Sequence, residues 1–385
     1  MRTWSRRSLV AVVTLAFSVT NVAALPHTAS AAVPSGGAAA VLAHMTLAQR
    51  VGQLFMVGTP ATYASSSTLR AITTYHVGNV MLTGRSYSGT QATAKVSAAL
   101  RARAGAAATY GVPLFIGTDQ EGGSVQVLQG TGFSSIPRAL TQGTWSTTTV
   151  RSRATTWGRQ LRSAGVNVNL APVMDTVPSA AAALKNPPIG YYHREFGYTT
   201  LRVASRGWSF AAGMETAGVS AAAKHFPGLG RVGANPDTSS GVTDRVTVRH
   251  DAYLAPFATA VRNGVPFLMM STAYYPRIDP NYPAAFSPTI VGGMVRGDLG
   301  FRGVVISDDL GNAKQVAAWS PASRALRFVT VGGDMVLTVN PTLLPEMYNA
   351  VLAKAKSSAA FRAKVNASAL RVLTAKQHRG LIPGP

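Results

Sequence analysis

The sequence predicts an α/β protein, a single-domain (β/α)8 TIM barrel. Three observations support this prediction: eight short apolar segments, helix-like segments between them, and polar side chains where several of the apolar segments end. Near-continuous apolar runs are typical of strands that are covered on both faces, and their alternation with helices favours a parallel sheet. A parallel barrel carries its chemistry at the carboxyl ends of its strands.

The eight strands are expected at residues 51–58, 77–82, 112–119, 166–172, 219–225, 265–271, 303–308 and 334–339. The helix-like segments lie at residues 90–107, 148–164, 201–217, 251–263, 287–299, 320–331 and 343–357. A doubly wound open sheet is the alternative arrangement. The sequence has no glycine-rich fingerprint after the first strand, which disfavours that alternative. The barrel is therefore assigned to residues 41–385.

Residues 1–31 have the features of a secretory signal peptide. Three arginines precede a short apolar run at residues 9–19, and a small-residue cleavage pattern ends at Ala31. The run is too short and too polar for a membrane-spanning helix, so no stable membrane insertion is expected after cleavage. Two adjacent arginines, Arg6 and Arg7, are compatible with the twin-arginine export route. Residues 32–40 are rich in small side chains and are expected to form a flexible lead-in. We therefore expect a bacterial protein that is secreted, extracellular or associated with the cell wall.

The 385-residue chain has a formal net charge of +22 and no cysteine. The lack of cysteine excludes disulfides, thiolate metal sites and a cysteine nucleophile. A strongly cationic surface attracts polyanions. Nucleic acid is not expected, because the basic residues are scattered and no aromatic platform is interleaved with them. An anionic cell-wall polymer is the expected partner, and a solvated surface that only maintains solubility is the alternative.

Charged side chains follow several predicted strands and are expected to meet at one barrel mouth. Asp119 and Glu121 follow the third strand and Asp175 follows the fourth. The fifth ends in Lys224 and His225, and the seventh ends in Asp308 and Asp309. Successive side chains on a strand point to opposite faces, so only one acid of the 308–309 pair is expected to face the pocket, and the same question arises for Lys224 and His225.

Such a set of carboxylates suits two kinds of chemistry. Carboxylates beside a sugar cleave glycosidic bonds, and clustered oxygens bind Mg²⁺ or Ca²⁺. The spacing alone leaves both open. Asp237 and Asp244 lie in the loop after the fifth strand, where a turn or a helix cap is the alternative role for each. No histidine pair has metal-ligand spacing and no GxSxG elbow occurs, so we expect neither a zinc site nor a serine hydrolase of the α/β type. No cofactor is expected.

Seven motifs in order resemble glycoside hydrolase family 3, specifically its single-domain β-N-acetylhexosaminidase branch. They are MTLAQRVGQLFMVG (45–58), GTDQEGG (117–123), LAPVMDT (170–176), NPPIGYYHREFG (186–197), KHFPGLG (224–230), PAAFSP (283–288) and LGFRGVVISDDL (299–310). The resemblance covers nearly the whole mature chain. It implies a barrel and a retaining exo-enzyme that removes terminal β-linked N-acetylglucosamine from cell-wall-type glycans.

The resemblance also implies roles for individual residues. Asp308 would be the nucleophile that forms a covalent glycosyl-enzyme. The residues that bind the sugar would be Asp119, Arg194, Lys224 and His225, and we group Asp175 with them. Whether water or another acceptor, such as phosphate, resolves the intermediate stays open.

The chain departs from the family pattern where the general acid is expected. Leu229 replaces the second histidine of KHFPGHG, and Gly241-Val242-Thr243 stands in place of an Asp-Ser-His segment. The arginines expected after DQEGG are also missing. We expect Asp237 to be the substitute acid, with Asp244 or a water held by Ser239 as alternatives. The alternative function is a catalytically weak or inactive glycan-binding barrel attached to the anionic cell wall.

Overall fold

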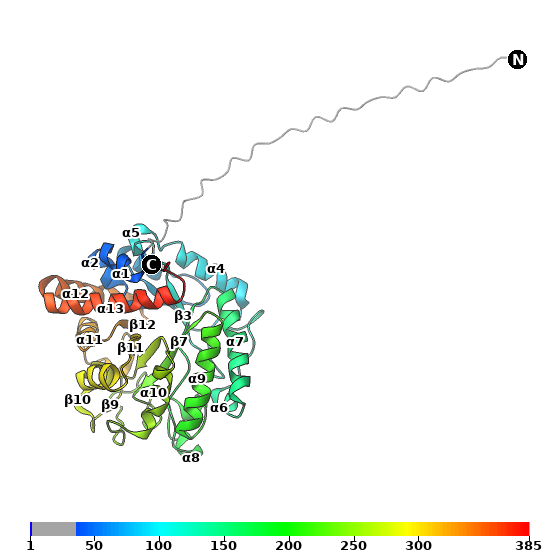
Figure 1. Ribbon diagram of the computed structural model, residues 1–385, viewed down its shortest axis with the longest axis vertical. Coiled ribbons are helices and arrows are strands. Elements are labelled where there is room, and N and C mark those ends of the chain that lie inside the picture. The colour runs from blue at the N-terminus through cyan, green and yellow to red at the C-terminus, as the bar shows by residue number, and fades with distance from the viewer. Residues whose placement is uncertain (2–35, 385) are drawn as a thin grey trace. The chain divides into compact units, whose positions relative to one another are not determined.

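Eight parallel strands close into a barrel in the computed structural model, which describes residues 36–384 together with Met1 (Figure 1). Around the barrel the order is β1, β12, β11, β8, β7, β6, β3 and β2. Their bounds are β1 Phe55–Pro60, β2 Asn79–Thr83, β3 Phe115–Thr118, β6 Val168–Asn169, β7 Ser220–Phe226, β8 Phe267–Met270, β11 Val304–Asp309 and β12 Met335–Thr338. The predicted fold class is confirmed. The predicted signal peptide and residues 32–35 of the predicted lead-in lie outside the described residues.

The barrel interior is filled by alternate side chains of its strands. Met56, Phe115 and Phe267 belong to this inner cluster, and the two phenylalanine rings meet edge to face at 5.5 Å. The intervening residues, such as Phe55 and Val57, pack outward in the larger core between strands and helices. Both faces of each strand are therefore apolar, which explains the uninterrupted hydrophobic runs in the sequence.

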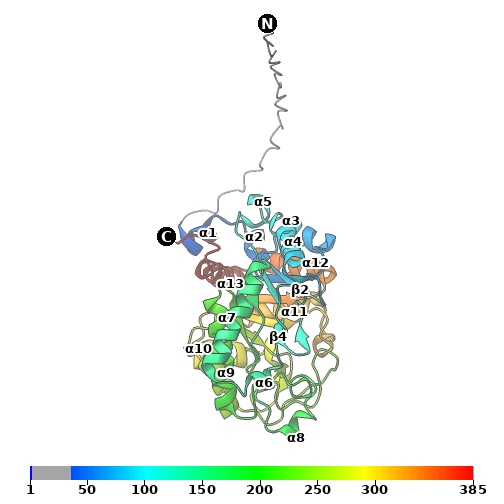
Figure 2. The ribbon, with the colours of Figure 1, turned by 90° about the vertical axis from the view of Figure 1, so that its right-hand side faces the viewer.

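Helices surround the strands and connect them (Figure 2). The α-helices are α1 Gly37–His44, α2 Leu47–Gly52, α3 Ser66–Thr74, α4 Gly89–Arg101, α5 Ala106–Thr109, α6 Ala139–Gln142, α7 Thr147–Ser163, α8 Ala180–Ala183, α9 Thr200–Thr216, α10 Ala255–Arg262, α11 Pro321–Thr330, α12 Leu344–Ser357 and α13 Ala359–His378. A π-helix, η4, covers Thr289–Asp298, and 3-10 turns occur at η1 Gly190–Tyr192, η2 Ala252–Leu254, η3 Ala284–Phe286, η5 Lys314–Val316 and η6 Pro341–Leu343. Each predicted helix has a helical counterpart, and the segment at 90–107 is divided into α4 and α5.

The first predicted strand begins later than expected because a capping box starts a helix there. The Thr46 hydroxyl accepts from the backbone N–H of Gln49, and the Gln49 side chain accepts from the backbone N–H of Thr46. This reciprocal pair satisfies two helix-terminal donors. Val51 therefore belongs to α2, and the strand starts at Phe55.

One end of the barrel, its base, is closed by two helices that the sequence analysis did not identify. Helix α1 begins inside the predicted lead-in, so residues 37–40 are helical; their small side chains allow close packing on α13, whose Gln377 accepts from the backbone N–H of Ala38 at 2.7 Å. Val372 and Ala375 of α13 join the inner barrel cluster. In Figure 1, α1, α2 and α13 gather at this end and α8, β9 (Tyr274–Tyr275) and β10 (Asp279–Pro283) at the other.

Candidate active site

A cavity of about 510 Å³ opens at the carboxyl ends of the barrel strands. Its lining comes from most of the barrel and includes Met81, Arg85, Asp119, Ser124, Leu170, Tyr192, Arg194, Lys224, His225, Leu229, Pro236, Asp237, Met269, Asp308, Asp309 and Leu337. The structure therefore brings six of the seven predicted site residues to one cavity. Asp175 is the exception.

Buried cations and carboxylates form one network at the bottom of this cavity. Lys224 Nζ lies 2.7 Å from Asp119 Oδ1 and 2.7 Å from Glu121 Oε1. Arg194 contacts both oxygens of the same Glu121 carboxylate, at 2.9 Å from Nε and 2.7 Å from NH2. A bidentate arginine pair fixes direction as well as charge. The network therefore holds Asp119, Lys224 and Arg194 in fixed positions at the cavity wall.

In this network the attraction between opposite charges offsets the effect of burial on each pKa. Burial alone would raise the pKa of Glu121, but Arg194 and Lys224 outweigh it and hold that pKa at about 2. Burial would lower the pKa of Lys224, but Asp119 and Glu121 raise it above its ordinary value. Glu121 and Lys224 are therefore both charged at neutral pH. Glu121 was noted in the sequence as a strand-following acid but was not assigned to the site.

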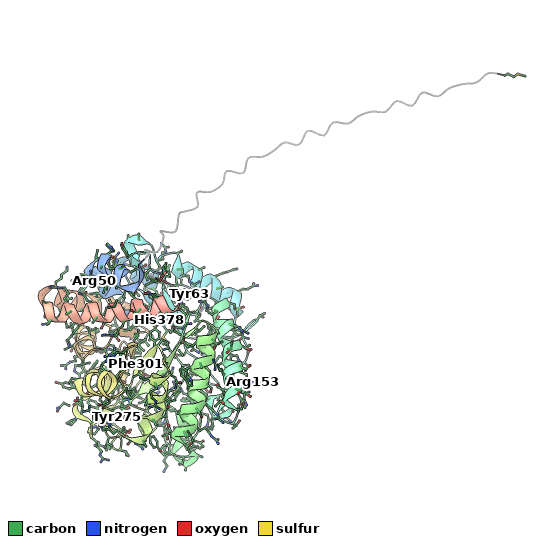
Figure 3. The ribbon with its side chains drawn as sticks, viewed as in Figure 1. Arg50, Tyr63, Arg153, Tyr275, Phe301 and His378 are labelled. Atoms are coloured by element: carbon green, nitrogen blue, oxygen red, sulfur yellow. The ribbon has the colours of Figure 1, made fainter. Side chains whose placement is uncertain are left out.

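Asp175 supports the site from behind and does not line the cavity, which differs from its predicted place among the sugar-binding residues. It is fully buried. Asp175 Oδ2 lies 2.7 Å from His225 Nδ1, and its Oδ1 accepts from the backbone N–H groups of His225 and Leu229. It thus orients the imidazole and holds the loop that follows β7. Tyr275, labelled in Figure 3, adds a hydrogen bond of 2.7 Å to the Gly228 carbonyl of that loop.

Position 230 of the same loop requires glycine because its backbone passes close to the backbone of Thr176. A Cβ atom at this position would lie 1.9 Å from the carbonyl oxygen of Thr176. Any side chain here would separate the loop from the segment that carries Asp175. Gly230 of KHFPGLG therefore permits close packing beneath the cavity.

Both members of each adjacent pair, Lys224–His225 and Asp308–Asp309, border the cavity, so the expectation that only one acid of the second pair would face it is wrong. Strand alternation ends where the ladder registers shift, between residues 223 and 226 in β7 and between residues 306 and 309 in β11. The peptide bond between Lys224 and His225 is cis.

The two acids of β11 are nevertheless in different environments. Asp309 Oδ1 accepts from the backbone N–H groups of Gly311 and Val339, at 2.9 and 3.1 Å, and its Oδ2 accepts from Asn312. Asp308 accepts one hydrogen bond, from the backbone N–H of Asp309 at 2.9 Å. Asp309 is therefore engaged in holding the loop, whereas Asp308 keeps an oxygen that is free to react.

The loop after β7 places Asp237 at the same cavity, next to the loop that follows Asp308. The backbone carbonyls of Pro236 and Asp237 accept from Gln315 and Lys314, at 3.0 and 3.1 Å. Asn235 makes the local turn, because its side-chain oxygen accepts from the Asp237 N–H at 3.0 Å. No hydrogen-bond partner engages the Asp237 carboxylate among residues 36–384, so it can face the cavity.

The pKa of Asp237 is raised to about 6, by burial of the carboxyl first and by the Asp308 carboxylate second, while His225 and Arg194 act in the opposite direction. The residue as a whole is exposed at the lip, so solvent can reach and reprotonate it. Asp244, in contrast, accepts from Val246 and Thr247 and has the turn role that was its alternative.

Glu195 is a buried acid next to Arg194 that lies outside the cavity lining. Both of its carboxylate oxygens are without a hydrogen-bond partner in the described part of the chain, and burial raises its pKa to about 7. Within residues 36–384 no group of three or more His, Asp or Glu side chains has the arrangement of a metal site. No helix of that region is both long and apolar enough to span a membrane.

Comparison with known proteins assigns the chain to a family. Residues 46–375 match the family described as the glycosyl hydrolase family 3 N-terminal domain. The chain belongs to glycoside hydrolase family 3. The predicted family and enzyme class, a glycoside hydrolase, are thereby confirmed.

Individual family 3 proteins are similar over most of the barrel. A crystal structure of a β-N-acetylhexosaminidase from Beutenbergia cavernae is 54% identical, with a TM-score of 0.86, and the match covers 87% of this chain and 99% of that chain. A family 3 β-N-acetylglucosaminidase from Paenibacillus is 32% identical, with a TM-score of 0.80, over 89% of this chain and 64% of that one. A β-hexosaminidase of Stenotrophomonas maltophilia is 32% identical over 302 residues, which are 76% of this chain and 85% of the relative.

Proposed function

We propose that this family 3 enzyme is an exported, retaining exo-β-N-acetylhexosaminidase that removes terminal β-linked N-acetylglucosamine from cell-wall-type glycans. The observation that carries the proposal is the shared cavity of Asp308 and Asp237, with the Lys224, Asp119 and Arg194 network at its bottom. The names of the Beutenbergia and Paenibacillus proteins support the sugar specificity.

The first step is attack by an Asp308 oxygen on the anomeric carbon. The bond from that carbon to the glycosidic oxygen breaks, its electron pair goes to the oxygen, and Asp237 donates the proton that the leaving group takes. In the second step Asp237, now a carboxylate, takes a proton from water while the water oxygen attacks the anomeric carbon and releases Asp308. This is the two-carboxylate scheme of retaining glycosidases. The raised pKa of Asp237 fits the role of general acid. Asp308 accepts one hydrogen bond, which leaves an oxygen free for the role of nucleophile.

The terminal sugar is held by the buried network. Asp119 accepts hydrogen bonds from sugar hydroxyls, and Lys224, Arg194 and His225 offer donors from neighbouring strands and loops. Since Glu121 and Asp175 already position these groups, little ordering is required when the sugar binds. Preorganised groups of this kind favour turnover over simple binding.

Two substrates and three variants test this proposal. An aryl β-N-acetylglucosaminide has a leaving group that needs little protonation, whereas a natural wall disaccharide needs the acid. Asp308→Ala should abolish turnover of both. Asp237→Asn should lower kcat on the disaccharide by ~10²- to 10⁴-fold and spare the aryl substrate. Ser239→Ala, in the same loop, should resemble the wild type. Lack of aryl turnover in the wild type would instead favour a glycan-binding barrel.

We also propose export and contact with anionic cell-wall polymers. The support is the signal-like residues 1–31 and the net charge of +22. A mature protein in the culture medium or wall fraction whose first residue is Ala32 or Val33 is the expected result of N-terminal sequencing. Retention of an intact N-terminus inside the cell would contradict the export proposal.

A further inference from the structure

The acid loop, which we define as residues 233–242, carries Asp237 and packs only lightly against the barrel. Its two buried residues are Pro236 and Val242, and the rest of the loop is exposed or half-buried. Segments with few buried apolar contacts open easily, so hydrogen bonds decide where their side chains lie. The partners of those two buried residues are therefore expected to determine the position of Asp237.

Gln315 contacts the backbone of both buried residues. Its N–H donates to the Pro236 carbonyl at 3.0 Å, its side-chain Oε1 accepts from the Val242 N–H at 2.9 Å, and its Nε2 donates to the Val242 carbonyl at 3.2 Å. Tyr274 also donates to the Val242 carbonyl, whereas the Val242 N–H has Gln315 as its partner in the described part of the chain. One residue therefore holds the acid loop on both sides of Asp237.

Gln315 is itself firmly held, in the loop that follows the nucleophile strand β11. It is 4% exposed and lies in η5. The guanidinium of Arg324 in α11 donates to four carbonyls of this loop, at distances between 2.7 and 3.4 Å. They are the carbonyls of Leu310, Gly311, Ala317 and Trp319. Asp308 lies at the end of the strand that leads into this loop, so the nucleophile and the acid loop share one rigid support.

We propose that Gln315 is a positioning residue for the glycosidase reaction and holds the Asp237 carboxyl at the cavity that it shares with Asp308. The proposal rests on the proposed function, in which Asp237 is the general acid. Without the Gln315 amide, the buried Val242 N–H would lack a partner, and this cost favours opening of the loop toward water. A general acid must lie within hydrogen-bond reach of the leaving oxygen, so a small displacement of Asp237 slows the reaction.

The test compares kcat on a natural wall disaccharide, which needs the acid, with kcat on an aryl β-N-acetylglucosaminide, which needs it little. Gln315→Met keeps the side-chain length and removes both hydrogen bonds of the amide. It should lower the disaccharide kcat by about tenfold to a hundredfold and leave the aryl kcat near the wild-type value. Gln315→Glu keeps an acceptor for the Val242 N–H and should give an intermediate ratio of the two kcat values. Hydrogen exchange in the acid loop should become faster in Gln315→Met.

Two further variants separate positioning of the acid from loss of stability. Asp237→Asn has no acid to position, so adding Gln315→Met to it should lower the disaccharide kcat no further. Gln49→Ala is the matched control, because Gln49 is a buried glutamine of α2 at the barrel base. Its Nε2 donates to the Ala106 and Ala107 carbonyls, both at 3.2 Å, and its loss should leave the kcat ratio as in the wild type.

Equal losses on both substrates in Gln315→Met, or a further loss in the double variant, would overturn the proposal, because Gln315 would then act on stability alone. A wild-type kcat ratio in Gln315→Met, with Asp237→Asn impaired on the disaccharide, would overturn it and leave the proposed function standing. If Asp237→Asn resembles the wild type on both substrates, the assignment of the acid is wrong and the role of Gln315 falls with it. Lack of aryl turnover in the wild type would contradict the glycosidase function itself.

Discussion

At the scale of single residues, the two candidate catalytic carboxylates differ in how the protein engages them. Asp308 receives one backbone hydrogen bond and lies at the cavity, while the Asp237 carboxylate is partly buried and has Asp308 as a neighbour. A carboxyl group near another negative charge in a partly buried site keeps its proton to higher pH. Asp237 can therefore keep a proton and act as the acid while Asp308 acts as the nucleophile.

The pH profile of the enzyme follows from the Asp237 pKa of about 6. The acid must be protonated to assist the leaving group, so kcat on a natural disaccharide should fall as pH rises above about 6. Asp237→Asn should remove this alkaline limb together with most of the activity. The aryl substrate should show a weaker limb. Profiles of kcat from pH 4 to pH 9 check this, and an unchanged limb in Asp237→Asn would assign the acid elsewhere.

Glu121 is a positioning residue whose removal leaves two buried cations without a shared partner. Breaking a buried ion pair by deleting one member destabilises a protein by about 3–5 kcal/mol. Glu121→Ala should lower the free energy of unfolding on that scale and raise KM, because Lys224 and Arg194 lose their orientation. Urea denaturation and kinetics measure both. Glu346→Ala, an acid at the start of α12 that accepts one hydrogen bond from Ala322, is the control and should change little.

The sequence could not predict this network, although all of its members were visible. Arg194 and Glu121 lie 73 residues apart and Lys224 and Asp119 lie 105 apart, and the register shifts that bring neighbours to one cavity leave no periodic signal. The carboxylates that follow strands were predictable because barrel topology alone brings strand ends together. Which of them bind a ligand and which, like Asp175, lie behind another side chain depends on packing.

At the scale of elements, the strands were predictable and the helix at the barrel base was not. Each strand is a short apolar run, since both of its faces are covered. Helix α13 is rich in alanine and carries scattered charges, so its apolar positions do not form a distinct stripe, yet its Val372 packs in the cluster inside the barrel. It also buries Lys376, whose Nζ donates to Gln53 Oε1 at 2.8 Å and to the Gly78 carbonyl at 2.9 Å.

Lys376 makes the stability contributed by α13 dependent on pH. Burial lowers its pKa from 10.5 to about 7. Between these values the unfolded chain binds a proton that the folded protein does not, so this group makes stability rise as pH increases from about 7 toward 10.5. The unfolding free energy of the wild type, measured relative to that of Lys376→Met, should therefore rise as pH increases from about 7 toward 10.5. A difference that stays constant from pH 7 to pH 10 would mean that Lys376 stays charged in the fold.

At the scale of the whole molecule, negative and positive charges are unevenly distributed. Helices α4 and α7 contain no acid, and their carboxyl-terminal ends lie toward the barrel base, where Arg103, two residues after α4, and Arg159 and Arg162 of α7 are exposed. Asp237 and Asp308, which have no ion-pair partner among residues 36–384, lie at the opposite mouth. Attraction of a polyanion to these three arginines would leave the mouth open to substrate.

Changing Arg103, Arg159 and Arg162 to glutamine should weaken binding to a poly(glycerol phosphate) polymer by roughly a hundredfold, at about 1 kcal/mol for each cation near an anionic surface. Added salt should weaken the binding of the wild type in the same way. The matched triple variant Lys185→Gln, Arg245→Gln and Arg277→Gln removes equal charge from exposed loop positions outside those two helices. Equal losses in both variants would indicate non-specific attraction to total charge.

The role of Asp308 is tested most directly by trapping the covalent intermediate. A fluorinated N-acetylglucosaminyl fluoride that forms the glycosyl-enzyme quickly and releases it slowly should add one sugar to the protein. Trypsin cuts after Arg302 and Lys314, so the label should appear on the peptide at residues 303–314, and fragmentation should place it on Asp308 rather than Asp309. A label on Asp309 or Asp237, or turnover without any covalent adduct, would contradict the mechanism.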